Sequence, residues 1–372
     1  MTHQTAAQPK PLHIAFFAPM KAPDHPVASG DRLMARLLIR CLEGAGHRVT
    51  VASTLRLRLA DAHDAAGWAT LRQAAATEAT RLAALWQATA PPDLWFCYHP
   101  YYKSPDLIGP ELAGRFGLPY VTCESSFSAR RNLGHWAEAQ ALALASVRQA
   151  AVNLCLTQRD AAGLAAAAPE ARLAMLAPFI DTAPFDATPA PDGLHLVTVA
   201  MMRAGDKLDS FRHLAGALTP LPEGLDWHLS VAGDGPERAA VKALFSDLPE
   251  GRVRWLGALD QAGVAALLAR GAVYVWPGVN EAYGLAYLEA QAAGLPVAAF
   301  HTAGVPEVVA GGLVPDGDRA ALAARLAALL RDPARVAREG RIARDHIHRT
   351  HSIGAAATRL ASVLRDVTGA RE

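Results

Sequence analysis

Short apolar runs alternate with longer helical segments along most of the chain, and this alternation predicts a parallel α/β fold. The runs are rich in β-branched and aromatic residues and end at Pro, Gly or polar residues, which is typical of buried strands. In the first half of the chain the expected strands are residues 12–18, 47–53, 94–98, 119–123, 152–156 and 172–177. In the second half they are residues 194–201, 227–232, 252–256, 272–276 and 296–300.

Amphipathic or alanine-rich segments separate many of these strands and predict helices. We expect them at residues 30–44, 68–89, 105–116, 136–149, 159–168, 237–245, 283–293, 318–330, 333–349 and 353–367. The proline-rich stretch 182–192 is typical of a linker. We therefore expect an N-terminal domain over residues 1–190, a C-terminal domain over residues 191–350, and a final helical segment over residues 351–372.

Composition narrows the class of protein. The chain has 372 residues, 51% of them hydrophobic, which is enough for two domain cores. The net charge of +1 gives no general field for nucleic acid or an anionic membrane. Neither a signal-peptide pattern at the start nor an uncharged apolar run long enough for a transmembrane segment is apparent. The four cysteines lack metal-ligand or redox spacing, so reduced residues of a cytoplasmic protein are expected.

Two carboxylates carry the strongest functional signal. Glu281 follows the expected strand 272–276, at the strand end where open parallel sheets bind ligands. Glu289 lies in the next helix beside an apolar stripe, roughly 9 Å along the helix axis from the start of that helix. A partly buried carboxylate needs hydrogen-bond donors, and sugar hydroxyls are suitable. Backbone N–H groups at Tyr283, Gly284 and Leu285 are expected to hold a phosphate. The alternative is a solvated Glu289 with a chance acid in the loop.

The same stretch resembles a known family. Glu281, seven intervening residues, Glu289, the run Ala-Gly-Leu-Pro-Val after it and Gly-Val-Pro-Glu at residues 304–307 are similar to the signature of retaining glycosyltransferase family 4. The resemblance implies the GT-B fold, an α/β architecture of two Rossmann-like domains that face each other across a cleft. It also implies that the last helix crosses back to the N-terminal domain. It is dense over residues 194–307 and only topological in the first half.

The resemblance implies roles for two acids and two cations. In that family the first acid contacts the donor sugar and the second contacts the ribose, which here are Glu281 and Glu289. Arg203 and Lys207 follow the expected strand 194–201, where the family clamps the donor diphosphate. Two cations suit that task, and the sequence has no evident metal-binding acid cluster, so a metal-independent reaction without a cofactor is expected. Their spacing is four positions where the family has five, and solvated loop charges are the alternative.

Other donor contacts are implied more weakly. Gly30 lies where the family's glycine-rich first loop approaches the donor, although the doubled glycine is absent and an ordinary helix start is the alternative. Leu259 lies on the strand exit where relatives hold the nucleobase through backbone groups. Such contacts leave little trace in side chains, so the sequence does not distinguish uracil, guanine and adenine. The expected donor is a nucleotide-sugar such as a UDP- or GDP-sugar. Gly-Asp-Gly at residues 233–235 is similar to a family turn, and turn geometry accounts for its glycines.

The acceptor side is expected in the first domain. His99, Tyr101 and Lys103 follow the expected strand 94–98 and form a polar aromatic cluster that suits an acceptor pocket or, equally, a packed aromatic loop. Glu124 stands where relatives often have a histidine near the reacting sugar. Two roles are open for Glu124, that of a catalytic group and that of a structural helix cap.

Two pairs of arginines are the nearest equivalents of the basic patch that membrane-docking relatives often carry. They are Arg56 with Arg58, and Arg130 with Arg131. We interpret both pairs as solvated surface charge.

The sequence thus leads to a hypothesis of a retaining, hexosyltransferase-type glycosyltransferase that acts on an unidentified acceptor. Its expected catalytic residues are Glu281, Arg203, Lys207 and Glu124. A nucleotide-sugar epimerase or a sugar phosphorylase on the same fold, and a non-catalytic nucleotide-sugar binder, are the alternatives. A binder would usually lack one of the acids or the cations, whereas this chain keeps both acids and both cations.

Overall fold

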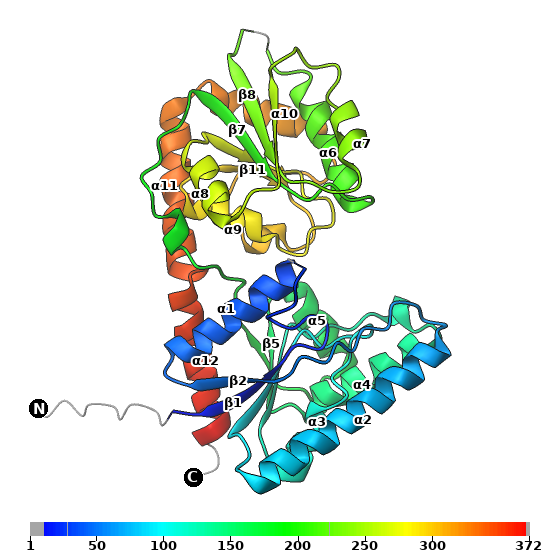
Figure 1. Ribbon diagram of the computed structural model, residues 1–372. Helices are drawn as coiled ribbons and strands as arrows, with labels where there is room; N and C mark the ends of the chain where they lie inside the picture. The colour runs from blue at the N-terminus through cyan, green and yellow to red at the C-terminus, as the bar shows by residue number, and fades with distance from the viewer. Residues whose placement is uncertain (1–10, 28, 223, 370–372) are drawn as a thin grey trace, which may run out of the picture. The chain divides into compact units, whose positions relative to one another are not determined.

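The computed structural model describes residues 11–27, 29–222 and 224–369, which form two compact units. The first unit contains the chain up to Ala177 together with the segment from Ala356 onward, and the second is Pro178–Ala355. Each unit is an α/β domain built on one parallel sheet (Figure 1). No helix in the described ranges combines the length and the apolar character that crossing a membrane requires.

The first domain contains a six-stranded sheet with the order β2-β1-β3-β4-β5-β6. Its strands are β1 (His13–Phe17), β2 (Arg48–Ser53), β3 (Leu94–Tyr98), β4 (Tyr120–Cys123), β5 (Val152–Cys155) and β6 (Leu173–Met175). Its helices are α1 (Gly30–Gly44), α2 (Ala65–Ala88), α3 (Gly109–Phe116), α4 (Gly134–Gln149), α5 (Gln158–Ala167) and most of α12 (Ile353–Thr368).

Alternating side chains of the central strands fill the two sides of this sheet. Ala15 and Phe17 of β1 and Trp95 of β3 belong to the apolar core that α2 and α3 cover. On the other side Phe16 stacks on Phe96, with ring centroids 5.7 Å apart. Both sides of the central strands are therefore buried, which explains why these strands are continuous apolar runs.

The second domain contains a six-stranded sheet with the order β12-β11-β10-β7-β8-β9. Its strands are β7 (Leu194–Val199), β8 (Trp227–Ala232), β9 (Val253–Gly257), β10 (Val273–Val275), β11 (Val297–Phe300) and β12 (Leu313–Val314). Its helices are α6 (Asp206–Leu218), α7 (Arg238–Ala243), α8 (Gln261–Ala269), α9 (Leu285–Ala292), α10 (Arg319–Leu330) and α11 (Pro333–Thr350). Helices α6, α7 and α10 lie on one face of the sheet, and α8, α9 and α11 on the other (Figure 1).

The strand order determines which loops can form a site. In the second sheet β7 lies between β8 and β10, and in the first sheet β1 lies between β2 and β3. At such a point the connections after the two adjacent strands leave in opposite directions, which opens a crevice at the carboxyl edge. The loops after β7 and β10 therefore meet in the second domain, and those after β1 and β3 meet in the first.

Every strand expected from the sequence is present, with ends shifted by a few residues. Strand β12 and helices α6 and α8 were not predicted. The omission of α6 matters because Lys207, expected on a loop, lies in the first turn of this helix. Gly205 precedes the helix with φ of 76°, a conformation that suits glycine and sets the direction in which α6 starts.

Candidate functional site

An ion pair joins the two loops at the switch point of the second sheet. The Lys207 ammonium donates a hydrogen bond to Glu281 Oε2, although 74 residues separate the two in sequence. The Lys207 Nζ also lies 5.5 Å from the ring centroid of Trp276, at the end of β10. The Lys207 and Glu281 side chains are 32% and 19% exposed. The structure thus brings together two residues singled out from the sequence, in a partly buried and oriented pair.

The loop that carries Glu281 is held from beneath by Tyr287. The Tyr287 hydroxyl donates a hydrogen bond of 2.9 Å to the Trp276 carbonyl. Gly278 and Gly284 both have φ of 72°, and a Cβ at either position would lie within 3 Å of the Tyr287 side chain. The Val279 N–H donates to Ser210 Oγ at 3.0 Å, which ties the loop to α6. Trp276, Ser210 and Tyr287 had no predicted role, because nothing in their local pattern distinguishes them from core residues.

Gly304 packs directly on the same loop. Its N–H donates a hydrogen bond of 3.2 Å to the Glu281 carbonyl. A Cβ at this position would lie 1.5 Å from the Ala282 carbonyl oxygen. The φ of −93° is one that any residue adopts, so the requirement for glycine here is space. Gly304, the first residue of the Gly-Val-Pro-Glu motif, therefore helps to position the loop of Glu281.

Glu289 lies half-buried in α9 without a hydrogen bond to its carboxylate from any described residue. Burial alone raises the pKa of Glu289 from 4.5 to about 7. Burial is the main cause of the raised pKa of Tyr274, and the charges of Glu289 and Glu281 raise this pKa further. The half-buried carboxylate is suited to accept a hydrogen bond from a ligand hydroxyl.

The beginning of α9 offers donors beside these acids. Gly284 is the N-cap residue, and no side chain caps the helix. Within the described part of the chain, the amides of Gly284, Leu285 and Ala286 have no hydrogen-bond acceptor. Such amides at a helix N-terminus, together with the helix dipole, favour an anion. The adjacent Tyr283 is 9% exposed.

The raised pKa of Glu289 leads to a prediction about stability. A carboxyl group whose pKa is higher in the folded state contributes most below pH 4.5, and this contribution is lost as the pH rises to about 7. Glu289→Gln keeps the neutral form at every pH. We therefore expect the variant to be more stable than the parent by about 1–3 kcal/mol at pH 8 and equally stable at pH 4. Urea unfolding at the two pH values measures this, and an equal difference at both would contradict it.

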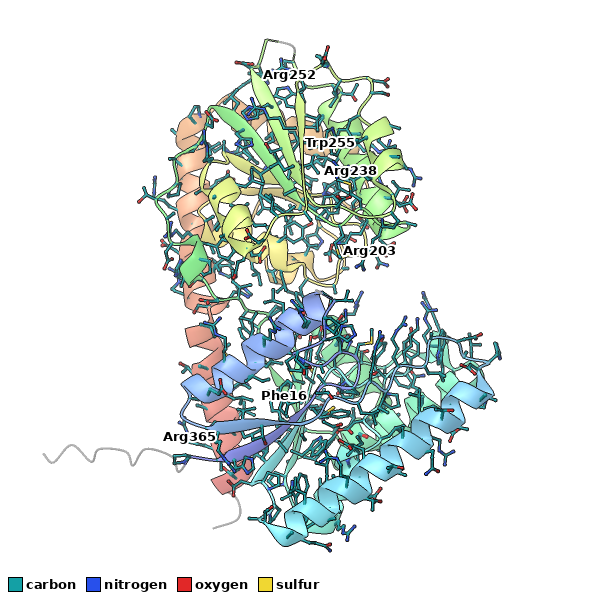
Figure 2. All side chains as sticks on the ribbon, viewed as in Figure 1. Phe16, Arg203, Arg238, Arg252, Trp255 and Arg365 are labelled. Atoms are coloured by element: carbon teal, nitrogen blue, oxygen red, sulfur yellow. The ribbon has the colours of Figure 1, made fainter. Side chains whose placement is uncertain are left out.

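Arg203 lies at the surface of the second domain, on the loop between β7 and α6 (Figure 2). The Gly-Asp-Gly turn fixes this loop, because the Met202 N–H donates to the Asp234 carbonyl at 3.0 Å. A Cβ at Gly233 or Gly235 would lie about 2 Å from the carbonyl oxygen of Ala200 or Met202. The two glycines thus serve close backbone approach as well as the turn. In the described structure, Arg203 has no ion pair with an acid.

The two remaining donor-side residues, Leu259 and Gly30, are exposed. Leu259 is 37% exposed on the loop after β9. That loop is joined to the Gly-Asp-Gly turn, since the Gly233 N–H donates to the Gly257 carbonyl at 2.7 Å. Gly30 is the first residue of α1 in the first domain, with Ser29 as its N-cap. The space around Gly30 is open.

A second cluster of titratable groups lies at the switch point of the first sheet. His99 Nδ1 lies 3.1 Å from Asp31 Oδ1, which joins the end of β3 to the start of α1. Burial opposes the charged form of His99, but the hydrogen bond to Asp31 and the charges of Glu124 and Asp31 together raise its pKa. The His99 ring also stacks on Tyr101, with centroids 4.7 Å apart. Asp31 was not expected here, because an acid in a first helical turn ordinarily complements the helix dipole.

Glu124 adjoins this cluster from the end of β4. Its Oε2 atom is buried without a hydrogen-bond partner among the described residues. Burial raises the pKa of Glu124, against the opposing effect of the His99 charge. Glu124 is not the N-cap residue of a described helix; Ser128 and Leu133 hold those positions in the following segment. The geometry therefore favours a role toward a ligand over a capping role.

Backbone strain marks both switch points. The described residues other than glycine with positive φ are His99 (58°), Glu124 (60°), Asn280 (54°) and Ala303 (43°). All four follow strands at the carboxyl edge of a sheet; Asn280 immediately precedes Glu281 in its loop, and Ala303 immediately precedes Gly304. Such conformations cost about 1–3 kcal/mol each and cluster at functional sites. Within the described ranges no group of three or more His, Cys, Asp and Glu side chains has an arrangement that could hold a metal ion.

Comparison with known proteins relates the second domain to glycosyltransferases. The family model for glycosyl transferases group 1 matches residues 193–332. A GDP-mannose-dependent monoacylated alpha-(1-6)-phosphatidylinositol monomannoside mannosyltransferase of Corynebacterium glutamicum is 34% identical over 150 residues, covering 38% of this chain and 39% of that protein. A 2-deoxystreptamine glucosyltransferase of Streptomyces kanamyceticus is 33% identical over 142 residues, with 36% of each chain covered. The chain thus aligns with less than two fifths of the length of these relatives.

Solved structures match over nearly the whole chain. Sucrose-phosphate synthase of Thermosynechococcus elongatus superposes with a TM-score of 0.73 at 20% identity, covering 96% of this chain and all of that one. Anabaena HepE in complex with UDP gives a TM-score of 0.69 at 15% identity, with 95% and 100% covered. The fold is GT-B. The expected α/β class is thereby confirmed, and the group 1 match covers the segment that carries Arg203, Lys207, Glu281 and Glu289.

Proposed function

We propose that the protein is a retaining glycosyltransferase that moves a sugar from a nucleotide-sugar to an acceptor, with the donor held on the second domain. The observation that carries this proposal is the Lys207–Glu281 pair at the switch point, together with the half-buried Glu289 carboxylate of α9, which accepts no hydrogen bond from a described residue. The group 1 match over residues 193–332 supports it. It also favours transfer over epimerisation, phosphorolysis or simple binding.

The donor is proposed to be a UDP- or GDP-sugar. The mannosyltransferase of Corynebacterium glutamicum depends on GDP-mannose by its name, and HepE binds UDP, so both bases occur among similar proteins. Glu289 would accept a hydrogen bond from the ribose, and Glu281 would orient the donor sugar. The amides of Gly284 and Leu285 would hold a phosphate beside Tyr283, while backbone groups near Leu259 would contact the base.

The leaving group is a nucleoside diphosphate, whose developing charge must be neutralised. Arg203 and Lys207 would supply two positive charges at the exit of β7 and the start of α6. We propose that these cations take the place of a metal ion, so that neither metal nor cofactor is needed. Same-face attack by the acceptor would retain the sugar configuration, with the departing phosphate taking the acceptor's proton; this step follows from the family resemblance.

The acceptor would bind on the first domain. His99 and Glu124 are held in strained backbone conformations at the carboxyl edge, and the buried Glu124 Oε2 atom has no hydrogen-bond partner among the described residues. Tyr101 stacks on His99, and Lys103 follows on the same turn. We propose that Glu124 accepts a hydrogen bond from an acceptor hydroxyl, with the His99–Asp31 pair in the same cluster.

A panel of nucleotide-sugars tests the donor site, since a ligand that binds only the folded state raises the melting temperature. Glu281→Gln and Glu289→Gln are then compared with Glu250→Gln, an exposed glutamate outside the site. We expect each site variant to lose about tenfold or more in affinity or turnover for the identified donor, because a charge-assisted hydrogen bond is replaced by a neutral one. Full binding and turnover in both site variants would show that the assignment is wrong.

A further inference from the structure

Three loops at the carboxyl edge of the first sheet carry cations and aromatic rings that the proposed donor site does not use. We call Arg58, Tyr102, Lys103, Arg131 and Trp136 the basic platform. Arg58 lies on the loop after β2, Tyr102 and Lys103 on the loop after β3, and Arg131 and Trp136 on the segment after β4. The two arginine pairs, interpreted from the sequence as separate solvated charges, therefore belong to neighbouring loops.

The sequence Leu-Arg-Leu-Arg-Leu at residues 55–59 builds one side of the platform. Leu57 and Leu59 are buried, so the alternation leaves Arg58 exposed. The Leu59 N–H donates to the Lys103 carbonyl at 2.8 Å, and Trp136 Nε1 donates to the Leu59 carbonyl at 3.1 Å. The backbone of residue 59 thus joins the three loops in a fixed arrangement.

Two cations of the platform, Lys103 and Arg131, lie over its aromatic rings. Reciprocal backbone hydrogen bonds between Tyr101 and Ser104 place Tyr102 and Lys103 at the tip of a tight turn. The Lys103 Nζ lies 4.7 Å from the Trp136 ring centroid and 5.8 Å from that of Tyr102. The Arg131 guanidinium lies 6.0 Å from the Tyr102 centroid. These cation–π contacts orient the charges without neutralising them.

No carboxylate within the described structure forms an ion pair with Arg58, Lys103 or Arg131. Glu138 is the acid nearest in sequence to Trp136, and its carboxylate accepts hydrogen bonds from Trp68 and Arg72 instead. Desolvation is the main cause of the lowered pKa of Lys103, and the positive charges of Arg58 and Arg131 lower this pKa further. The whole chain has a net charge of only +1, so the positive charge of the platform is a local excess.

We propose that the basic platform binds a phosphate-bearing acceptor, whose phosphoryl group contacts Arg58, Lys103 and Arg131 while its ring packs on Tyr102 or Trp136. Guanidinium groups match phosphate oxygens in two-point contacts, and an uncompensated ammonium adds charge. The ligand is called the acceptor because of the proposed function; the binding of phosphate does not depend on that function. A soluble sugar phosphate and a lipid headgroup share this chemistry.

The test uses the full chain with glucose 6-phosphate, glucose, inorganic phosphate, and vesicles of phosphatidylglycerol or phosphatidylcholine. Titration calorimetry measures the soluble probes and vesicle sedimentation the lipids. We expect glucose 6-phosphate to bind better than glucose. Arg58→Ala and Lys103→Ala should each weaken its binding about tenfold, and the triple Arg58→Ala/Lys103→Ala/Arg131→Ala variant about 100-fold or more. Arg365→Ala, an exposed cation of α12 (Figure 2), is the matched control and should change nothing.

Binding to phosphatidylglycerol vesicles alone, lost in the triple variant, would support the proposal with a lipid headgroup as the source of phosphate. The proposal would be overturned if neither glucose 6-phosphate nor phosphatidylglycerol vesicles bind, or if the triple variant binds them as well as the parent protein does. UDP and GDP binding separates this inference from the proposed function. The triple variant should keep nucleotide binding. If the parent protein binds glucose 6-phosphate but no nucleotide, the proposed function is wrong while the proposal for the platform stands.

Discussion

Replacing Lys207 by methionine is expected to lower kcat/KM for the donor by about 10²–10³, because one preorganised charge at the leaving diphosphate is removed. Methionine keeps the apolar stem against Trp276, so packing should change little. Lys242→Met is a matched control, since its Nζ lies 5.8 Å from the ring centroid of Trp255 on the exposed surface of the same domain. Steady-state kinetics with the donor found in the panel measures the effect.

The same reasoning applies to Arg203→Ala, which removes the second charge without disturbing an observed contact. If kcat falls by a similar factor while the melting temperature changes little, Arg203 stabilises the transition state. For Lys207→Met, Glu281 loses its partner as well, so the variant's free energy of unfolding must be measured beside its kinetics. Unchanged kcat/KM in both variants would contradict the proposal that these cations neutralise the leaving group.

Gly304→Ala is expected to destabilise the second domain by about 2–4 kcal/mol and to abolish nucleotide binding, since the new Cβ overlaps the Ala282 carbonyl. The clash is with backbone, 1.5 Å away, so it cannot be relieved by rotating a side chain. Relief requires that the loop of Glu281 moves. Urea unfolding and UDP or GDP titration measure the two effects.

Gly224→Ala provides the control for this substitution. Gly224 belongs to the same domain and is exposed, and a Cβ at this position would meet no atom within 4 Å. The variant should behave like the parent protein. Retained nucleotide affinity in a folded Gly304→Ala variant would show that the position of the Glu281 loop does not control the donor site.

The local sequence was sufficient to locate most elements, but not the elements with weak local signals. The strands from β1 to β11 are compact apolar runs bounded by breakers, and such runs have few other solutions. Helix α6 begins with the polar residues Asp206 and Lys207 after a glycine, so its periodicity is weak where it starts. The two-residue strand β12 is too short to give an alternating pattern.

The sequence by itself determined the α/β class, the strand–helix order and the spacing of Glu281 and Glu289, because these follow from local periodicity and breakers. Only the tertiary structure decided that Lys207 reaches Glu281 across 74 residues and that His99 reaches Asp31 across 68. The reason is that strand order, which brings β7 beside β10 and β1 beside β3, depends on packing of the whole domain. The raised pKa of Glu289 likewise depends on burial, which is a property of the folded chain.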